Sequence, residues 1–179
     1  MGLSLVFRLD GRVAPQADLT HTLKAIASEL DYPMLVVTSS AGNELSGCLV
    51  GFSTQCSIDP FRMAVFISSR NHTLAVALRS SELAVHFLAT HQEHLARLFG
   101  ELTGDRTDKF SKCAWHFAEN GAPILDEVAR WLSGPILRQF PAGDHHCFII
   151  EPTLAFAGDG WEHQYGFQQA RKLEPGHPP

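Results

Sequence analysis

The middle of the chain is built from short apolar runs separated by turn-forming residues. Apolar residues, many of them β-branched, dominate residues 34–38, 45–52, 63–68 and 83–88. Runs of this length, bounded by Gly, Pro, Asn and Ser, are typical of buried or half-buried strands. Too few residues separate the first three runs for a crossover helix, so we expect these strands to pair in antiparallel fashion.

Two further runs extend this pattern toward the C-terminal end. Residues 131–140 and 145–152 are joined by residues 141–144, whose sequence Pro-Ala-Gly-Asp predicts a β-hairpin. Six antiparallel strands with few helices favour a closed or nearly closed barrel whose openings are covered by the helices. We therefore predict a mainly β (α+β) fold.

Three segments show helical spacing instead, at residues 18–30, 71–81 and 91–100. Asn71 is a suitable N-cap for the second of them. The apolar positions expected to define one face of each helix are Leu19, Leu23, Ile26 and Leu30 in the first, Leu74, Ala77 and Leu78 in the second, and Leu95, Leu98 and Phe99 in the third.

The length of 179 residues predicts a single domain, because domains contain roughly 100–200 residues. The stretch 101–121 is polar and is expected to be irregular. Beyond Gly158 the chain becomes polar again and ends in a Pro-rich sequence. We place the domain at residues 1–157 and interpret residues 158–179 as a C-terminal arm or edge segment.

Composition and charge narrow the functional classes. Hydrophobic residues make up 45% of the chain and charged residues 18%, which is typical of a globular chain rather than a disordered one. The 14 basic and 19 acidic residues leave a net charge of −5. Because a protein that coats a duplex needs a basic surface, we expect no nucleic-acid partner.

The sequence also bears on location. No apolar run approaches the roughly 20 residues that span a bilayer, so no membrane partner is expected. Residues 1–8 lack the basic start of a signal peptide. The four cysteines, Cys48, Cys56, Cys113 and Cys147, are widely spaced and contain no C-x-x-C pair, as is usual for reduced thiols. We therefore expect a cytoplasmic protein.

Several common chemistries have no motif here. The sequence contains no G-x-G-x-x-G after a strand, no P-loop and no G-x-S-x-G turn. His91 and His94 lie one helical turn apart, but surface histidines explain this pattern better than a metal does. His145 and His146 point to opposite faces of a strand and cannot chelate one ion together. No metal site is predicted.

Residues 46–61 combine small side chains, glycines, hydroxyls and amides. Such residues let backbone N–H groups approach a flat ligand and its phosphate, but a β-bulge and turn on an edge strand explain them equally well. Residues 70–73 (Arg-Asn-His-Thr) open the second helix, where free N–H groups suit a phosphate. Taken alone, these residues are better explained as an ordinary capping segment.

Six features follow one another between about residue 33 and residue 152. They are Thr38 at a strand end, the Gly-rich stretch 47–53, the Ser-Ile-Asp-Pro sequence 57–60, the helix start 71–73, Phe87 in strand 83–88, and the Gly-Asp-His sequence 143–145. This ordered set resembles the flavin reductase-like family of FMN-binding split β-barrels. The order carries the resemblance, because no single motif is specific.

The resemblance implies an antiparallel split β-barrel with Greek-key topology, present as a homodimer with FMN or FAD near the subunit interface. Cofactor contacts are implied for Cys48, Leu49, Val50, Gly51, Phe52 and Ser53 around the ribityl phosphate, Gln55, Cys56 and Ser57 along the isoalloxazine ring, and Arg70, Asn71, His72 and Thr73 at the phosphate. His145 is the implied catalytic residue, on the nicotinamide side. The activity would be that of an NAD(P)H-dependent flavin reductase, whose reduced flavin could serve a partner monooxygenase.

The chain departs from the family pattern around the expected flavin. Many members have Thr and Asn-Ser where this chain has Leu49, Gly51 and Phe52, so backbone amides or Arg70 must replace the missing hydroxyls. Phe61 replaces the second proline of the common Pro-Pro pair. Two alternatives remain open: a non-catalytic flavin-binding protein for storage or sensing, and a related split barrel that uses a deazaflavin or haem.

Overall fold

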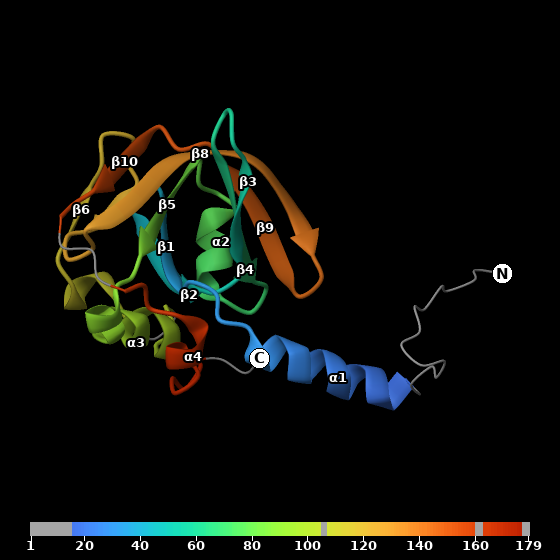
Figure 1. The fold of residues 1–179 in the computed structure, drawn as a ribbon. Helices are drawn as coiled ribbons and strands as arrows, with labels where there is room; N and C mark the ends of the chain where they lie inside the picture. Colours follow the sequence, from blue (N-terminus) through green and yellow to red (C-terminus); the bar gives the residue numbers. More distant parts are fainter. Residues whose placement is uncertain (1–15, 105–106, 160–162, 177–179) are drawn as a thin grey trace. The chain divides into compact units, whose positions relative to one another are not determined.

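The computed structural model describes residues 16–104, 107–159 and 163–176. The chain divides into two units, with the boundary in the sequence between Asp31 and Tyr32. The first unit contains helix α1 (Gln16–Glu29), which confirms the predicted helix (Figure 1). Its apolar positions Leu19, Leu23, Ile26 and Leu30 are 51–56% exposed. Within the described ranges, no helix has the length and apolar character needed to cross a membrane.

The second unit is mainly β. Its strands are β1 (Leu35–Ala41), β2 (Glu44–Val50), β3 (Ser53–Ser57), β4 (Arg62–Ser68), β5 (Glu82–Phe87), β6 (Trp115–Phe117), β7 (Pro123–Leu125), β8 (Arg130–Ala142), β9 (His145–Ile150) and β10 (Leu154–Ala157). Its helices are α2 (His72–Ala77), α3 (Glu93–Glu101) and α4 (Phe167–Ala170), with 3₁₀ turns η1 (Thr90–Gln92) and η2 (Phe110–Lys112). The predicted fold class is thereby confirmed.

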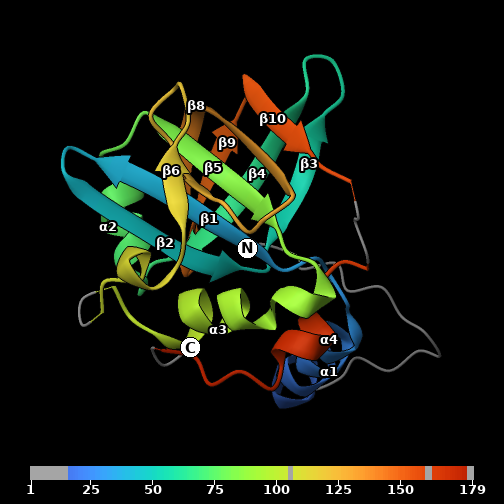
Figure 2. The ribbon, with the colours of Figure 1, turned by 90° about the vertical axis from the view of Figure 1, so that its left-hand side faces the viewer.

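Seven strands form an antiparallel path in the order β2-β1-β5-β8-β9-β4-β3, and β10 pairs with β8. The sheet curves around α2, which packs against β1, β2 and β4 (Figure 1). Helices α3 and α4 lie side by side across one end of the strands (Figure 2). The sheet encloses an apolar cluster that includes Val37, Val65 and Phe148, each at 0% exposure. Burial of such side chains is the main force that holds the curved sheet together.

The N-cap prediction for α2 is confirmed, because the backbone N–H of Thr73 donates to Asn71 Oδ1 at 3.1 Å. The predicted C-terminal end is wrong, since the helix ends at Ala77 and Leu78 is 42% exposed. After Ala77 the backbone bonds span three residues, as in Ser80 N to Ala77 O. This tightening turns the chain into β5.

The apolar run 45–52 does not form one strand, contrary to the prediction. β2 ends at Val50, and β3 begins at Ser53. The physical reason is topological, because β2 pairs with β1 and β3 pairs with β4, at opposite ends of the sheet path. Gly51 and Phe52 carry the chain from one end to the other, and Phe66 N donates to Phe52 O at 3.0 Å.

The stretch 101–121 is more ordered than predicted. β6 lies within it and pairs with β7 to form a hairpin that covers the outer side of β1 and β5. Ile124 is 1% exposed and packs with Ala84, and Thr38 Oγ1 donates to Pro123 O at 2.5 Å. Three-residue strands are too short to show a period of two, so the sequence gives no sign of them.

His86 is a buried polar residue at the centre of this arrangement. Its Nδ1 lies 3.0 Å from Val36 O, and Leu125 N donates to its Nε2 at 3.1 Å. The ring is therefore neutral, with the proton on Nδ1, and joins β5 to β1 and β7. Burial lowers the pKa of His86 from 6.5 to about 4, since the charged form loses its hydration.

This shift predicts a loss of stability in mild acid. Between pH 6.5 and about 4 the unfolded chain binds a proton at His86 that the folded chain excludes, so the free energy of unfolding falls as the pH falls. The His86 contribution should be about 3 kcal/mol, given ~1.4 kcal/mol for each pKa unit. Urea unfolding across this pH range measures it. A His86→Gln variant should lose that part of the pH dependence, and an unchanged slope would contradict the assignment.

Candidate functional site

A pocket of about 420 Å³ opens beside the end of β2. Its walls come from the entry to β1, the end of β2 and the following linker, β4, the cap of α2, the start of β9 and the region of α4. The lining residues are Tyr32, Met34, Cys48, Leu49, Val50, Gly51, Phe52, Phe66, Ser68, Asn71, Asp144, His145, Phe167 and Pro175. We call it the aromatic pocket. Most of its lining is apolar, which suits a flat organic ligand.

Four rings form a continuous row along this pocket. Phe167 stacks on Tyr32, with centroids 4.6 Å apart and planes 22° apart. Tyr32 contacts Phe52 at 5.7 Å, and Phe52 contacts His145 at 5.0 Å, both in tilted geometry. Packed rings offer flat apolar surface that costs little conformational entropy when a ligand binds.

The polar side of the pocket comes from backbone. β2 pairs with β1 along one edge only and is an end of the sheet path, so its other edge has no strand partner in the described part of the chain. The exposed edge of a strand presents N–H and C=O groups. Alternate residues of an antiparallel strand point their N–H and C=O groups away from the partner strand. Gly47 O accepts from Lys109 on this edge, so Leu49, two residues further on, brings hydrogen-bonding backbone to the same pocket as the aromatic row.

His145 is held by its neighbour in the hairpin turn. Its Nδ1 lies 2.7 Å from Asp144 Oδ1, and its side chain is 22% exposed. The hydrogen bond from His145 is the main reason why the pKa of Asp144 is lowered, and Arg70 adds a smaller electrostatic effect. With Nδ1 facing the carboxylate, Nε2 is the ring nitrogen left to meet a ligand.

The structure brings together part of the predicted set. Cys48, Leu49, Val50, Gly51, Phe52, Asn71 and His145 all line the aromatic pocket. Ser53, Gln55, Cys56 and Ser57 lie in β3 and do not line it. The Gln55 amide donates to Ser57 O at 3.0 Å, and Cys56 is exposed. The roles of all these residues toward a ligand stay predictions.

The residues predicted to contact a phosphate also lie in different places. Arg70 is exposed, and its positive charge helps to lower the pKa of Asp144, which lines the pocket. Thr73 is 1% exposed, and its hydroxyl lies 3.0 Å from Ser46 Oγ. His72 faces another part of the molecule, where its Nε2 lies 3.1 Å from a Glu44 oxygen.

Sequence reasoning missed half of the lining. The missed residues are Tyr32, Met34, Phe66, Ser68, Asp144, Phe167 and Pro175. Tyr32 and Phe167 are far apart in the chain, and no spacing connects them. The signal that could have found Asp144 is its place in the predicted Gly-Asp-His turn beside His145.

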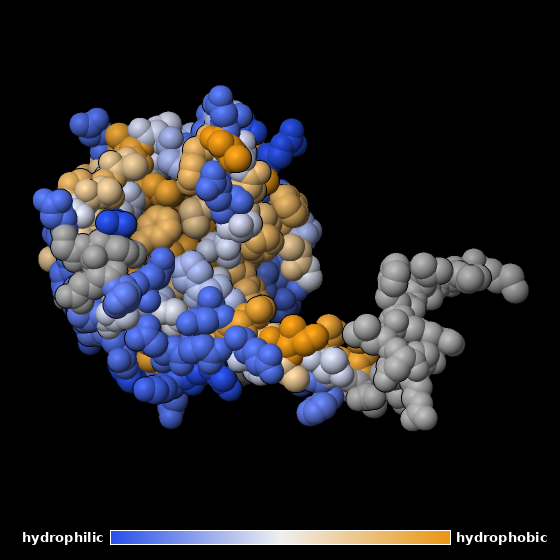
Figure 3. Space-filling view, in the orientation of Figure 1, coloured by the Kyte–Doolittle hydropathy of each residue, from blue (hydrophilic) through white to orange (hydrophobic). Residues whose placement is uncertain are grey.

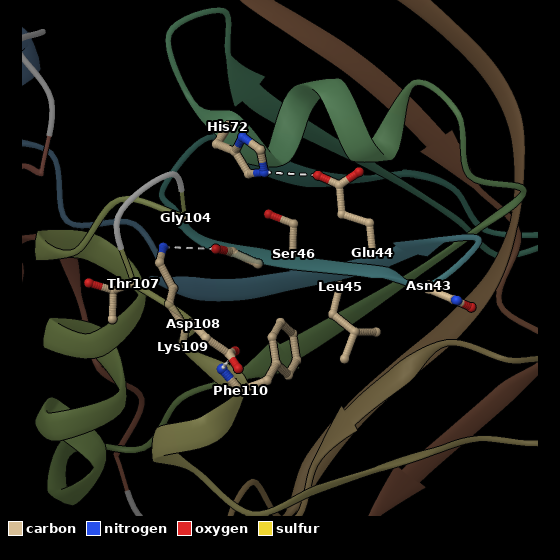
Figure 4. A pocket seen from close by; sticks show the side chains of 11 residues that line it. Asn43, Glu44, Leu45, Ser46, His72, Gly104, Thr107, Asp108, Lys109 and Phe110 are labelled. Carbon is tan, nitrogen blue, oxygen red and sulfur yellow. Dashed lines mark hydrogen bonds and ion pairs between the residues drawn. The ribbon is translucent and has the colours of Figure 1, made fainter.

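A second hollow, of about 330 Å³, lies between the first half of β2, the start of α2 and the segment around Lys109 (Figure 4). It is polar, but its charges are satisfied from within. Lys109 is 4% exposed, and its ammonium donates to Gly47 O at 3.0 Å and Phe99 O at 3.1 Å. Glu44 accepts from His72 and, at 2.5 Å, from Arg79. We therefore assign a structural role to these groups: Lys109 holds the loop before η2 against β2, and Glu44 holds α2 against β2.

Several curated proteins are similar to this chain in sequence. A 4-hydroxyphenylacetate 3-monooxygenase reductase component of Klebsiella oxytoca is 27% identical over 131 residues, 70% of this chain and 76% of the relative. An NADH:FMN oxidoreductase of Rhodococcus qingshengii is 26% identical over 114 residues, which are 64% of this chain. The match spans only 58% of that relative's own length.

The fold has a solved counterpart. An NADH:FAD oxidoreductase of Streptomyces globisporus superposes with a TM-score of 0.77 at 23% identity, over 91% of this chain and 96% of that one. The family model for the flavin reductase like domain matches residues 27–171, from the end of α1 to just beyond α4. Because this match covers most of its 179 residues, the chain belongs to the flavin reductase like domain family.

Proposed function

We propose that this chain is an NAD(P)H-dependent flavin reductase that binds FMN or FAD in the aromatic pocket. The observation that carries the proposal is that the aromatic row and the unpaired edge of β2 line the same pocket. Membership of the flavin reductase like domain family supports it.

The residues present fit a flavin. An isoalloxazine ring is flat and apolar on its faces, with hydrogen-bonding groups along one edge. Tyr32, Phe52 and Phe167 supply rings for the faces, and the backbone of Leu49 on the open edge of β2 supplies a donor and an acceptor for the edge. When bound, the flavin supplies the hydride-accepting chemistry, and the protein supplies binding, orientation and electrostatics.

The phosphate is proposed to lie near the start of α2. Asn71 lines the pocket, and the charge of Arg70 reaches the neighbouring Asp144. Leu49, Gly51 and Phe52 carry no hydroxyl, so backbone N–H groups and Arg70 carry this contact in the proposal. Thr73 contributes indirectly, because its hydroxyl is bonded to Ser46.

His145 is proposed as the catalytic residue. The Asp144 carboxylate orients its ring, which leaves Nε2 to donate or accept a hydrogen bond at the ligand. A donor at this point stabilises negative charge that develops on the ring system during reduction.

We also propose that the protein is a homodimer that acts in the cytoplasm and supplies a monooxygenase. Apolar side chains on β8 and around the β3–β4 turn are exposed, as Ile58 (88%), Phe61, Leu137 and Phe140. Figure 3 shows apolar surface in this region. Four free cysteines support a reducing compartment, and the Klebsiella relative is named as a monooxygenase reductase component.

The experiment that tests the activity mixes purified protein with FMN and either NADH or NADPH in the absence of oxygen. Loss of the visible absorbance of oxidised flavin is expected with at least one nucleotide. Tight FMN binding without this loss would contradict the reductase and favour storage or sensing. The spectrum of the protein as isolated separates both from a haem or deazaflavin protein.

Replacement of His145 should separate chemistry from binding. His145→Ala is expected to slow flavin reduction by about tenfold or more, the effect of losing one hydrogen bond to a charged group. The FMN dissociation constant should change less, because the phosphate contacts lie elsewhere. Stopped-flow absorbance and FMN titration measure the two quantities. His94→Ala is the control, since His94 is exposed and bonded to Glu127. An unchanged reduction rate in His145→Ala would remove His145 from the mechanism.

A further inference from the structure

The C-terminal segment, residues 163–176, is hydrogen-bonded to the ends of two central strands. Tyr165 N donates to Leu88 O, just after β5, and Met34 N donates to Tyr165 O, just before β1, both at 2.9 Å. Phe167 N donates to Tyr32 O, also at 2.9 Å. Because β1 and β5 are themselves paired, the segment is attached to two adjoining strand ends of the barrel.

Side-chain packing fixes the same segment. Tyr165 is 1% exposed and lies in a core cluster with Leu88, Leu95 and Phe99. Further along, Gly176 N donates to Gly100 O at 3.1 Å. A Cβ on Gly176 would lie 2.4 Å from Glu101 O, so only glycine allows this approach. The segment is therefore held at both ends, with α4 beside α3 (Figure 2).

Between these two attachments the segment faces the aromatic pocket. Phe167 and Pro175 line the pocket, and Phe167 stacks on Tyr32. A smaller hollow of about 210 Å³ shares Met34, Leu49, Asn71, Phe167 and Pro175 with it and continues to Ala170 and Leu173. Both hollows are therefore lined in part by this segment, and the apolar surface continues from one to the other.

We propose that the C-terminal segment forms part of the flavin site, and that the Phe167–Tyr32 pair is the apolar wall on which the flavin ring packs. The inference rests on the proposed function. The pair is already stacked and its backbone is fixed, so little ordering cost is left for binding. Affinity for FMN then depends on Tyr32 and Phe167, which lie outside the strands.

The test is FMN titration of the full chain by fluorescence quenching. Phe167→Ala and Tyr32→Ala should each raise the FMN dissociation constant roughly five- to tenfold, the loss of about one ring-stacking contact. Tyr32→Phe keeps the ring and should bind as the wild type does. Phe156→Ala is the matched control, because Phe156 is 52% exposed on β10, beside Trp131 and outside the pocket.

The thermal unfolding midpoint of each ligand-free variant shows whether the Phe167–Tyr32 pair contacts the flavin or only stabilises the fold. A lower midpoint with unchanged FMN affinity in both alanine variants would overturn the proposal. If the alanine variant does not fold, Phe167→Leu is used in its place, because it keeps the apolar bulk without the flat ring. Weaker FMN binding by Phe167→Leu would support the proposed wall, and binding equal to that of the wild type would contradict it. Wild-type protein that binds neither FMN nor FAD would instead contradict the proposed function itself.

Discussion

The close approach of the Tyr32 ring to the Gly51 backbone is the constraint on which the pocket depends. A Cβ on Gly51 would lie 2.6 Å from the Tyr32 ring, so a larger residue would push the ring away. Gly51 stands where the chain leaves β2 for the opposite end of the sheet. The same crossing leaves the edge of β2 open. Aromatic walls and a free backbone edge therefore have one topological cause.

The scaffold around the pocket is fixed by buried polar groups that are paired with backbone. His86 joins β5 to β1 and β7, and Lys109 ties its loop to β2 and α3. Burial lowers the pKa of both side chains. Each makes two hydrogen bonds to backbone groups, and such bonds offset the cost of burying a polar group. Rigid strands can then hold the site residues at fixed positions.

The sequence predicted the fold class and about half of the pocket for a physical reason. Apolar runs and turn residues are local signals, and they identify β1, β4, β5 and the β8–β9 hairpin. The Gly-rich stretch after Gly47 and the Gly-Asp-His turn are also local, because the residues of each motif are consecutive in the sequence. Phe167 and Tyr32 meet only because backbone bonds join the C-terminal segment to the entry of β1, and such long-range pairing leaves no local pattern. The break at Gly51 is equally invisible, because an apolar run does not reveal which neighbour each residue pairs with.

The central claim is that flavin binds between the β2 edge and the rings of Tyr32, Phe52 and Phe167. A crystal structure of the chain with FMN tests it most directly. The isoalloxazine ring is expected in the aromatic pocket, in contact with the backbone of 48–52 and with the Phe167–Tyr32 pair. A flavin ring seated elsewhere, for example in the polar hollow beside Lys109, would contradict it.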